Sequence, residues 1–243
     1  MPGFFVSITK VMKKFILVFL LFSFSLVSYA QREIVPVNWE EIKKVVAESP
    51  DSVKTLVTRT IQKDTTLSIH EFILAFYGQS IISKGKESEL VFDCLGLFSR
   101  GDYKEALLKA REALAINPLS IKALEVAGMS ILILIKSGDP SYSADEANDY
   151  YVRESALLYT ISRTGDGSKE HPFYVTSLPD EYVFMTSGLG VKKIIGQFSC
   201  DSRYDIFTLG GKSKNYSNKE VWFDVSRHFE YLLERFVESE KNK

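Results

Sequence analysis

The chain has 243 residues, of which 45% are hydrophobic and 25% are charged, and its formal net charge is −1. This composition is typical of a globular protein with a packed core, and it excludes a disordered or low-complexity chain. The near balance of acidic and basic residues leaves no electrostatic footprint for a nucleic acid, so no nucleic-acid partner is expected.

The first 30 residues have the pattern of an export signal. Lys13 and Lys14 precede an apolar run over residues 15–27, and the triplet at 28–30, Ser-Tyr-Ala, follows it. Small residues at the first and third positions of such a triplet are what a signal peptidase requires. The apolar run is shorter than the roughly 20 residues of a membrane-spanning helix. We therefore predict a signal peptide over residues 1–30, with an N-terminal membrane anchor as the alternative.

Cleavage after Ala30 would change the charge of the protein. Met12 followed by two lysines is itself a normal opening of a signal peptide, so Met1 looks like an upstream start codon, and the sequence leaves the choice between the two starts open. The removed segment carries three lysines and no acid, so the 30 basic residues fall by three to 27 against 31 acidic ones. The resulting charge of about −4 argues against a polybasic role at a membrane surface. No membrane span is expected in the chain that remains.

Two cysteines, Cys94 and Cys200, remain in the exported chain. Export permits a disulfide between them, and the alternative is two small buried residues. The three histidines, His70, His171 and His228, show no metal-ligand spacing with the cysteines. We expect neither a metal site nor a cofactor.

Residues 31–163 carry apolar side chains at helical spacing. Asn38 and Ser68 stand where caps of two helices are expected, and Ser143 or Asp145 stands at the start of a later one. The pattern predicts helices at about 39–48, 50–61, 69–81, 87–99, 103–117, 121–135 and 144–163.

The centre of this region resembles a tetratricopeptide repeat, a pair of antiparallel helices of about 34 residues. The turn would be formed by residues 101–103, Gly-Asp-Tyr, with Tyr103 packing across the hairpin. Ala106, Ala113 and Pro118 fall at the positions that the repeat requires, and the two alanines would let the helices approach closely. Ala110 departs from the pattern, because a large residue is expected there.

A second, distorted repeat is predicted directly after the first. Leu124, Ala127 and Gly128 stand where a large residue, a small residue and a glycine are needed. Its first helix then continues to Ile135, so the turn at 136–140 comes late. The alternative is an ordinary helical bundle that contains a Gly-Asp-Tyr turn by chance.

Residues 164–243 change from helical to strand periodicity after the loop Gly165-Asp166-Gly167. The order of elements is a strand, a helix that opens at residues 177–181, three strands and a last helix. This order fits a small antiparallel sheet covered by one or two helices. In the last helix, Phe229, Leu232, Leu233 and Phe236 are expected to form a buried stripe, with His228 packed beside it. The predicted fold class is therefore α+β, with tetratricopeptide-like helical hairpins over 31–163 and an α+β region over 164–243 packed on them.

Two groups of residues are candidates for binding. Asp166, Glu170 and His171 lie close together at the junction of the two parts, where they would form an acid–base pair or a cation site; the alternative is turn chemistry. Tyr150, Tyr151 and Tyr159 would line a concave groove, or else belong to the core.

No catalytic residues are predicted. The sequence contains no G-x-S-x-G, no H-E-x-x-H and no Walker loop. Nothing in it indicates the oligomeric state.

The arrangement resembles a family of uncharacterised exported bacterial proteins, a domain of unknown function found with tetratricopeptide-like helices. The resemblance rests on the signal peptide that ends at residues 28–31 and on four segments of the second part. These segments are Gly165–Val175, Asp180–Tyr182, Tyr204–Phe207 and Val221–Val225. The resemblance implies a location in the periplasm of a Gram-negative bacterium or outside the cell, and it implies no known activity.

We therefore expect an exported, non-enzymatic binding or scaffold protein whose helical repeats present a groove to a protein or peptide partner. The alternative is a small hydrolase or sugar-binding protein with its site near Asp166–His171. A toxin-like or immunity-type partner protein is a third alternative, for which the sequence offers no specific feature.

Overall fold

Seven helices of the described chain precede its sheet. The computed structural model describes residues 33–241, and the predicted signal peptide lies outside them. These helices are α2 (Trp39–Glu48), α3 (Pro50–Ile61), α4 (Ile69–Ser83), α5 (Ser88–Arg100), α6 (Tyr103–Ile116), α7 (Ile121–Lys136) and α8 (Ala144–Thr164). The helical spacing read from the sequence places every one of them within a few residues of its observed bounds.

Side-chain caps explain where three of these helices begin. The Oδ1 atom of Asn38 accepts a hydrogen bond from the backbone N–H of Glu41 at the start of α2. Ser68 and Glu71 form a reciprocal capping box at the start of α4. Ser143 accepts from a backbone N–H in the first turn of α8, so the cap there is Ser143 and not Asp145. Each cap satisfies a backbone donor that the helix itself leaves free.

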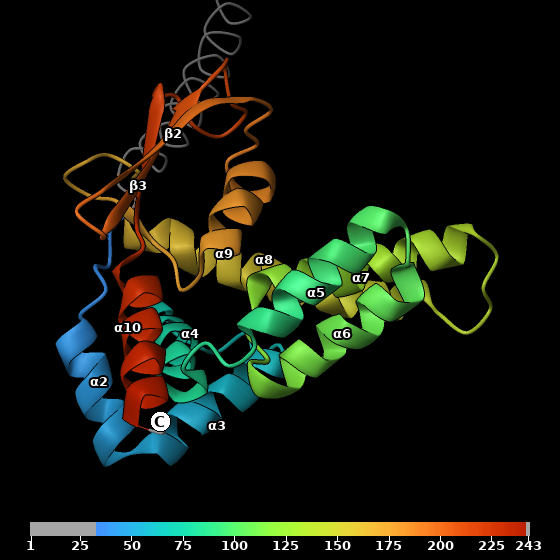
Figure 1. The fold of residues 1–243 in the computed structure, drawn as a ribbon, viewed down its shortest axis with the longest axis horizontal. Helices are drawn as coiled ribbons and strands as arrows, with labels where there is room; N and C mark the ends of the chain where they lie inside the picture. Colours follow the sequence, from blue (N-terminus) through green and yellow to red (C-terminus); the bar gives the residue numbers. More distant parts are fainter. Residues whose placement is uncertain (1–32, 242–243) are drawn as a thin grey trace, which may run out of the picture. The chain divides into compact units, whose positions relative to one another are not determined.

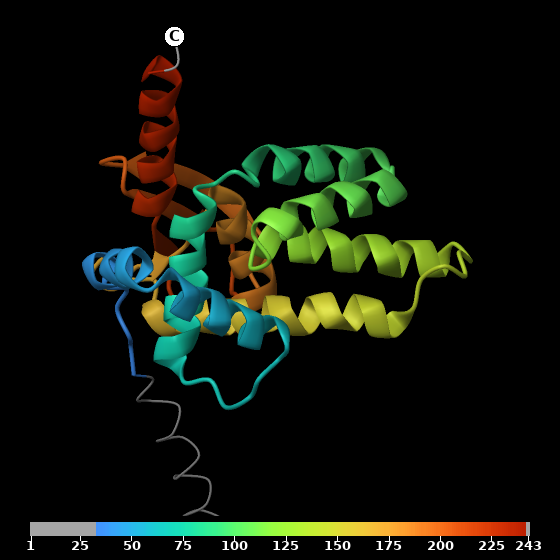
Figure 2. The ribbon, with the colours of Figure 1, turned by 90° about the horizontal axis from the view of Figure 1, so that it is seen from below.

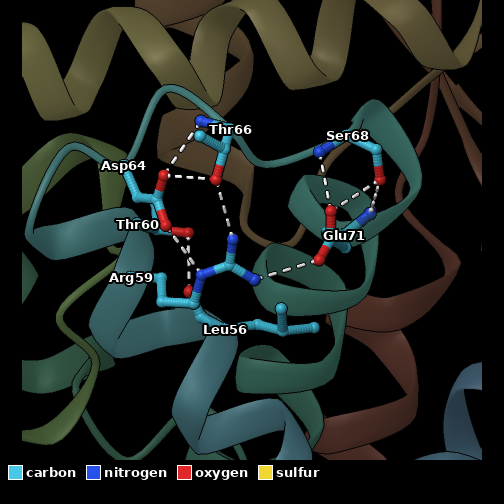
Figure 3. A network of polar contacts seen from close by, with 7 residues as sticks. All are labelled: Leu56, Arg59, Thr60, Asp64, Thr66, Ser68 and Glu71. Atoms are coloured by element: carbon cyan, nitrogen blue, oxygen red, sulfur yellow. Dashed lines mark hydrogen bonds and ion pairs between the residues drawn. The ribbon is translucent and has the colours of Figure 1, made fainter.

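A polar network joins the end of α3 to the start of α4 (Figure 3). The guanidinium of Arg59 donates to Asp64 at 2.8 Å, to Glu71 at 3.0 Å and to the hydroxyl of Thr66 at 3.1 Å. Hydrogen bonds from Thr66 and then from Arg59 lower the pKa of the Asp64 carboxyl to about 2. Charge-assisted hydrogen bonds therefore fix the turn at 62–67.

Helices α5, α6, α7 and α8 pack in succession, each against the next (Figure 2). Gly101 has φ +87°, the left-handed conformation that the tight turn between α5 and α6 needs. The rings of Phe98 and Tyr103 meet edge to face across this turn at 5.3 Å. Three alanines of α6 are fully buried: Ala106, Ala110 and Ala113. The small side chains thus let the helices approach closely, as the sequence predicts.

The contact between α7 and α8 depends on a glycine. A methyl group at Gly128 would lie 3.2 Å from the ring of Tyr151, so any larger side chain would push the two helices apart. The connection between them runs through residues 137–143 and is longer than the turn at Gly101. This lengthening is the late turn expected after Ile135.

The second part of the chain forms a four-stranded sheet. Its elements are β1 (Phe173–Tyr174), α9 (Leu178–Val183), the π-helical turn η1 (Phe184–Gly188), β2 (Ile194–Cys200), β3 (Tyr204–Leu209) and β4 (Glu220–Asp224). The strand order is β1-β4-β3-β2. Phenylalanines from β1, η1, β3 and β4 contact one another at its centre: Phe173, Phe184, Phe207 and Phe223.

The predicted small sheet is confirmed, and it is mixed rather than antiparallel throughout. Strand β1 pairs with β4 in parallel, whereas β2–β3 and β3–β4 are antiparallel. The chain leaves β1 through α9 and returns beside it only after the β2–β3 hairpin, so a crossover joins the parallel pair. A strand of two residues gives no sequence signal of its direction.

The last helix, α10 (Ser226–Lys241; red in Figure 1), buries a different face from the one predicted. Of the expected buried stripe, Leu233 and Phe236 are 67% and 64% exposed and Leu232 is exposed too, whereas Phe229 is half-buried and packs against the core. The buried side instead holds Arg227, His228 and Tyr231. The expectation that His228 packs in the interior is therefore confirmed, whereas the stripe beside it is not.

Ionic contacts explain why the polar side of α10 faces inward. The guanidinium of Arg227, which is 2% exposed, donates to the backbone carbonyl of Ser80 near the C-terminal end of α4. That end of a helix carries partial negative charge, which attracts a cation. Lys43 of α2 pairs with Glu230 at 3.0 Å, and Arg235 pairs with Glu89 of α5 at 3.0 Å.

One hydrophobic core runs through both parts of the chain. Residues from 35 onward form one contact unit, and the core cluster extends from Val35 to Val225. The hydroxyl of Tyr77 in α4 donates to the carbonyl of Tyr174 in β1 at 2.8 Å. Within residues 33–241, no helix has the length and apolar character that crossing a bilayer demands.

Candidate functional site

The loop that holds Asp166, Glu170 and His171 is a closed turn with exposed side chains. The Asp166 carboxylate accepts from the backbone N–H of Ser168 at 2.9 Å, and the backbone N–H of Asp166 donates to the carbonyl of His171 at 2.9 Å. Ser168 accepts from the backbone N–H of His171 at 3.1 Å. The structure thus brings Asp166 and His171 together through their backbones, and the hydrogen bonds of the loop are those of turn chemistry.

Gly165 makes this turn sensitive to substitution. A methyl group at this position would lie 2.2 Å from the carbonyl oxygen of Pro172 and 2.5 Å from that of His171. We expect Gly165→Ala to lower the free energy of unfolding by about 1–3 kcal/mol, because the backbone must move. Gly96→Ala is the control: its nearest contact is 3.5 Å, and removing a helical glycine should raise stability by about 0.5–1 kcal/mol. Urea denaturation of both variants checks this; equal effects would contradict it.

The three candidate tyrosines of α8 lie in different environments. Tyr150 is buried, with the guanidinium of Arg153 4.9 Å from its ring. Tyr151 packs against Gly128, as described above. Tyr159 is 50% exposed and accepts a hydrogen bond from Arg163 at 3.0 Å. The structure therefore does not gather the three rings on one surface.

A pocket that is partly open to solvent lies elsewhere in the chain, and its empty space, open solvent included, is about 370 Å³. Its wall is built from the start of α5, the turn between α6 and α7, the start of α9 and the inner side of α10. Its polar wall includes Glu87, Asn117, Thr176, Asp180, His228 and Tyr231. Residues separated by more than a hundred positions in the sequence thus meet in one hollow, which is our candidate functional site.

Asp180 is the most deeply buried carboxyl group in this wall. Its side chain is 2% exposed, and one oxygen accepts from the hydroxyl of Thr176 at 3.1 Å. The other oxygen, Oδ1, is buried without a short hydrogen bond. Burial raises the pKa of the Asp180 carboxyl to about 6, although the hydroxyls of Ser177 and Thr176 and the charge and backbone N–H of Lys122 act to lower it. A carboxyl group with this pKa is ready to exchange a proton or to receive a donor at neutral pH.

The imidazole of His228 supplies a second unpartnered atom. His228 is 7% exposed and its Nδ1 atom has no hydrogen-bond partner. Burial lowers the pKa of the imidazole, while the carboxylate of Asp205 raises it. Its ring meets the ring of Tyr231 edge to face at 4.9 Å, and the Tyr231 hydroxyl accepts from Ser88 at 3.3 Å.

Glu87 adds a second carboxylate, directly before α5. Its Oε1 atom accepts from the amide of Asn117 at 2.6 Å and from the hydroxyl of Ser83 at 3.3 Å. Its Oε2 atom is buried and has no partner. Buried polar atoms in folded proteins nearly always find a partner, so three unpartnered atoms around one hollow point to a bound ligand or water.

Neither cysteine takes part in this site. Cys94 is buried and Cys200 is half-buried, and both are free, so the disulfide alternative is wrong for this structure. Within residues 33–241, no group of three or more His, Cys, Asp or Glu side chains is arranged to hold a metal ion.

The sequence did not reveal the pocket because its residues share no spacing. The local pattern places Glu87 at the start of one helix and Asp180 at the opening of another, and it indicates packing for His228. The one signal that points to the site is Asp180 next to Glu181, two acids in a short segment whose other side chains include Leu178 and Val183.

The fold and the pocket define a small α+β protein with a polar, acidic hollow between its helices. The family profile of DUF4919, a domain of unknown function, matches residues 40–234, so the chain belongs to this family. All the residues of the pocket lie inside the matched range. Neither a curated protein nor a solved structure gives a significant match to the chain.

Proposed function

We propose that this chain is an exported, non-enzymatic binding protein whose pocket receives a side chain of a protein or peptide partner. The observation that carries the proposal is the unpartnered pair of buried atoms, Oδ1 of Asp180 and Nδ1 of His228, in the wall of one open hollow. A buried polar atom without a partner costs about 1–3 kcal/mol, and a ligand that bonds to it removes that cost.

The rim of the pocket favours a peptide over a free small molecule. The pocket is partly open to solvent, so a side chain of a partner could reach its polar wall. Phe92 lines the rim and is 60% exposed. An exposed ring there offers apolar contact to the chain on either side of an inserted residue.

The helices α5 to α8 support a binding role in a second way. The tight turn at Gly101, the ring contact between Phe98 and Tyr103 and the buried alanines of α6 fit tetratricopeptide-like packing. Repeats of this type hold peptide partners on their surfaces. Export, to the periplasm or beyond it, rests on the residue pattern at 13–30 and belongs to the same proposal.

The alternative expectation, a hydrolase or sugar-binding site at Asp166–His171, receives less support. The carboxylate of Asp166 accepts from a backbone N–H of its own turn, and His171 is exposed rather than held beside a carboxylate. The geometry there accounts for a turn, and it gives no second candidate function.

Peptide selection on the purified protein tests the proposal. Peptides chosen from a random displayed library are measured by fluorescence anisotropy against the wild type and Phe92→Ala. We expect the affinity to fall about tenfold or more in Phe92→Ala, because the rim contact is lost. The matched control is Leu108→Ala, which truncates an exposed apolar residue of α6. Failure to select any peptide, or equal affinities in the two variants, would show that the pocket is not a peptide site.

A further inference from the structure

We infer that the group received by the pocket is a positively charged nitrogen group, an ammonium or a guanidinium. This inference deepens the proposed function and rests on it. The observations are the charges of the wall, the positions of its unpartnered acceptors and the aromatic rings beside them.

The charges of the wall are of one sign. Glu87 and Asp180 both line the pocket, and none of the described residues that line it is lysine or arginine. The nearby cations form their ion pairs with other acids, Arg227 with Glu230 and Lys122 with Glu125, although the charge of Lys122 also acts on Asp180. No ion pair within 4.0 Å joins either lining carboxylate to a described residue, so a cationic ligand would supply the missing counter-charge, whereas an anion would be repelled.

The unpartnered atoms are acceptors of the kind that an ammonium or guanidinium donates to. Oε2 of Glu87 and Oδ1 of Asp180 are both buried and free of partners. A hydrogen bond between an ionised donor and a carboxylate is about twice as strong as one between neutral groups. Two carboxylates from different elements can therefore hold one multi-donor cation between them.

Aromatic side chains complete the arrangement. Tyr231 and Phe92 both line the pocket, the first buried and the second at the rim. A cation over an aromatic face is attracted by the ring quadrupole, most strongly where water is excluded. A metal ion is disfavoured, because two carboxylates without a third acidic or imidazole ligand in suitable geometry fall short of a cation cage.

The charge of Asp180 makes binding depend on pH. The groups that interact with it are Glu181 on the same helix, Lys122 on α7, Tyr77 on α4 and Tyr231 on α10, and His228 lines the same pocket. Glu87 faces the pocket from the start of α5.

Only the ionised form of Asp180 attracts a cation, so affinity should fall as the pH drops below about 6, where this carboxyl takes up its proton. The fall approaches about tenfold for each pH unit below that value, and protonation of His228 acts in the same direction.

Small probes of defined charge test the inference. Binding of Nα-acetyl-lysine methylamide, Nα-acetyl-arginine methylamide, Nα-acetyl-norleucine methylamide and putrescine is measured on the purified protein by nitrogen-15 chemical-shift titration near neutral pH. We expect a lysine or arginine probe to bind at least about tenfold more tightly than the uncharged norleucine probe. Putrescine distinguishes a side chain of a partner from a free amine. If putrescine binds as tightly as the lysine probe, the natural ligand is a free amine.

Two variants locate the binding in the pocket. We expect Asp180→Asn to weaken the cationic probes about tenfold or more and to reduce the pH dependence near 6 to the part that His228 contributes, with circular dichroism confirming the fold. Glu87→Gln removes the charge of the less buried carboxylate and should also weaken binding of the cationic probes. The matched control is Asp51→Asn, an exposed acid on α3, which should leave the affinity unchanged.

The possible failures are distinct. Equal binding of the norleucine and lysine probes, or full affinity in both pocket variants, would overturn the inference about charge. If selected peptides without lysine or arginine still lose affinity in Phe92→Ala, the peptide-binding function stands and only the inference about charge falls. If no peptide is selected but putrescine binds through Asp180, the charge inference stands and the peptide function falls.

Discussion

Glutamine in place of Glu181 is expected to raise the free energy of unfolding at neutral and alkaline pH and to leave it nearly unchanged in acid. Glu181 is fully buried in α9, and both of its carboxyl oxygens lack a hydrogen-bond partner. Burial, followed by the neighbouring carboxylates of Asp205 and Asp180, raises the pKa of Glu181 well above 4.5. The folded protein therefore holds the protonated form, whereas the unfolded chain ionises near its ordinary value.

The direction of the change in stability with pH follows from the number of protons that the folded and unfolded states bind. Above pH 4.5 the unfolded chain releases the proton of Glu181 while the folded protein retains it, so stability falls as the pH rises. The loss is at most about 1.4 kcal/mol for each pH unit up to the folded pKa. A neutral amide does not titrate, so Glu181→Gln avoids this loss. The variant and the wild type should be similar below pH 4.5, where both side chains are neutral.

Urea denaturation at about pH 4, 6 and 8 measures this difference. Glu48→Gln, which neutralises an exposed acid of α2, is the control and should follow the wild type at every pH. Two further buried carboxyl groups keep part of the pH dependence in the variant. Burial raises the pKa of Asp180 to about 6 and that of Glu154 to about 7. Parallel profiles for Glu181→Gln and the wild type would contradict the assignment of a protonated Glu181.

Truncation of Phe223 is expected to cost about 3–5 kcal/mol of stability, the usual range for Phe→Ala in a core. Phe223 of β4 is fully buried, and its ring lies 5.7 Å from Phe207, 6.0 Å from Phe173 and 6.2 Å from Phe184. Alanine would leave a cavity at the point where the Phe223 ring contacts side chains of β1, β3 and η1. The sheet cannot collapse to fill it, because the neighbouring rings come from three different elements.

The same substitution on the exposed side of the sheet gives the control. Phe198 of β2 is 64% exposed, so Phe198→Ala removes a ring of equal size without opening a cavity. We expect it to change the free energy of unfolding by less than about 0.5 kcal/mol. Thermal and urea denaturation of the two variants provide the comparison. Similar losses would mean that the aromatic cluster does not form the core of the sheet.

The order and bounds of the elements could be predicted because their signals are local. Ser68 followed three residues later by Glu71 marks a helix start, and Gly101 marks a tight turn. The small residues of α6 likewise predict a close helix contact, and Ala106 and Ala113 are fully buried. Each of these features depends on residues within a few positions of one another, so one sequence contains all the information needed.

The face of α10 could not be predicted, because the apolar stripe and the buried stripe differ. Leu233 and Phe236 carry the helical periodicity, which normally marks the inner side. The inner side is decided instead by Arg227, whose acceptor lies at Ser80, about 150 positions earlier in the chain. Periodicity reports the apolar residues of a helix and says nothing of a polar partner on another element.

The candidate site was missed for the same reason. Asp180 lies in the predicted opening of a helix and His228 in a helix expected to pack, and neither position shows an unusual local pattern. Their shared pocket depends on how α9 and α10 are placed against α5. The exposed loop at Asp166–His171 has a denser polar sequence, yet its groups bond mainly within the turn.

The attachment of α10 through its polar side makes one wall of the pocket sensitive to ionic strength. Dissolved salt screens ion pairs at partly exposed positions such as Lys43–Glu230 and Arg235–Glu89. The packing of a helix that buries its apolar side is instead stabilised by salting-out ions, because they strengthen apolar burial. His228 and Tyr231 belong to a helix whose packing depends partly on ion pairs. The stability with which α10 keeps this wall of the pocket in place therefore depends on the ions in solution.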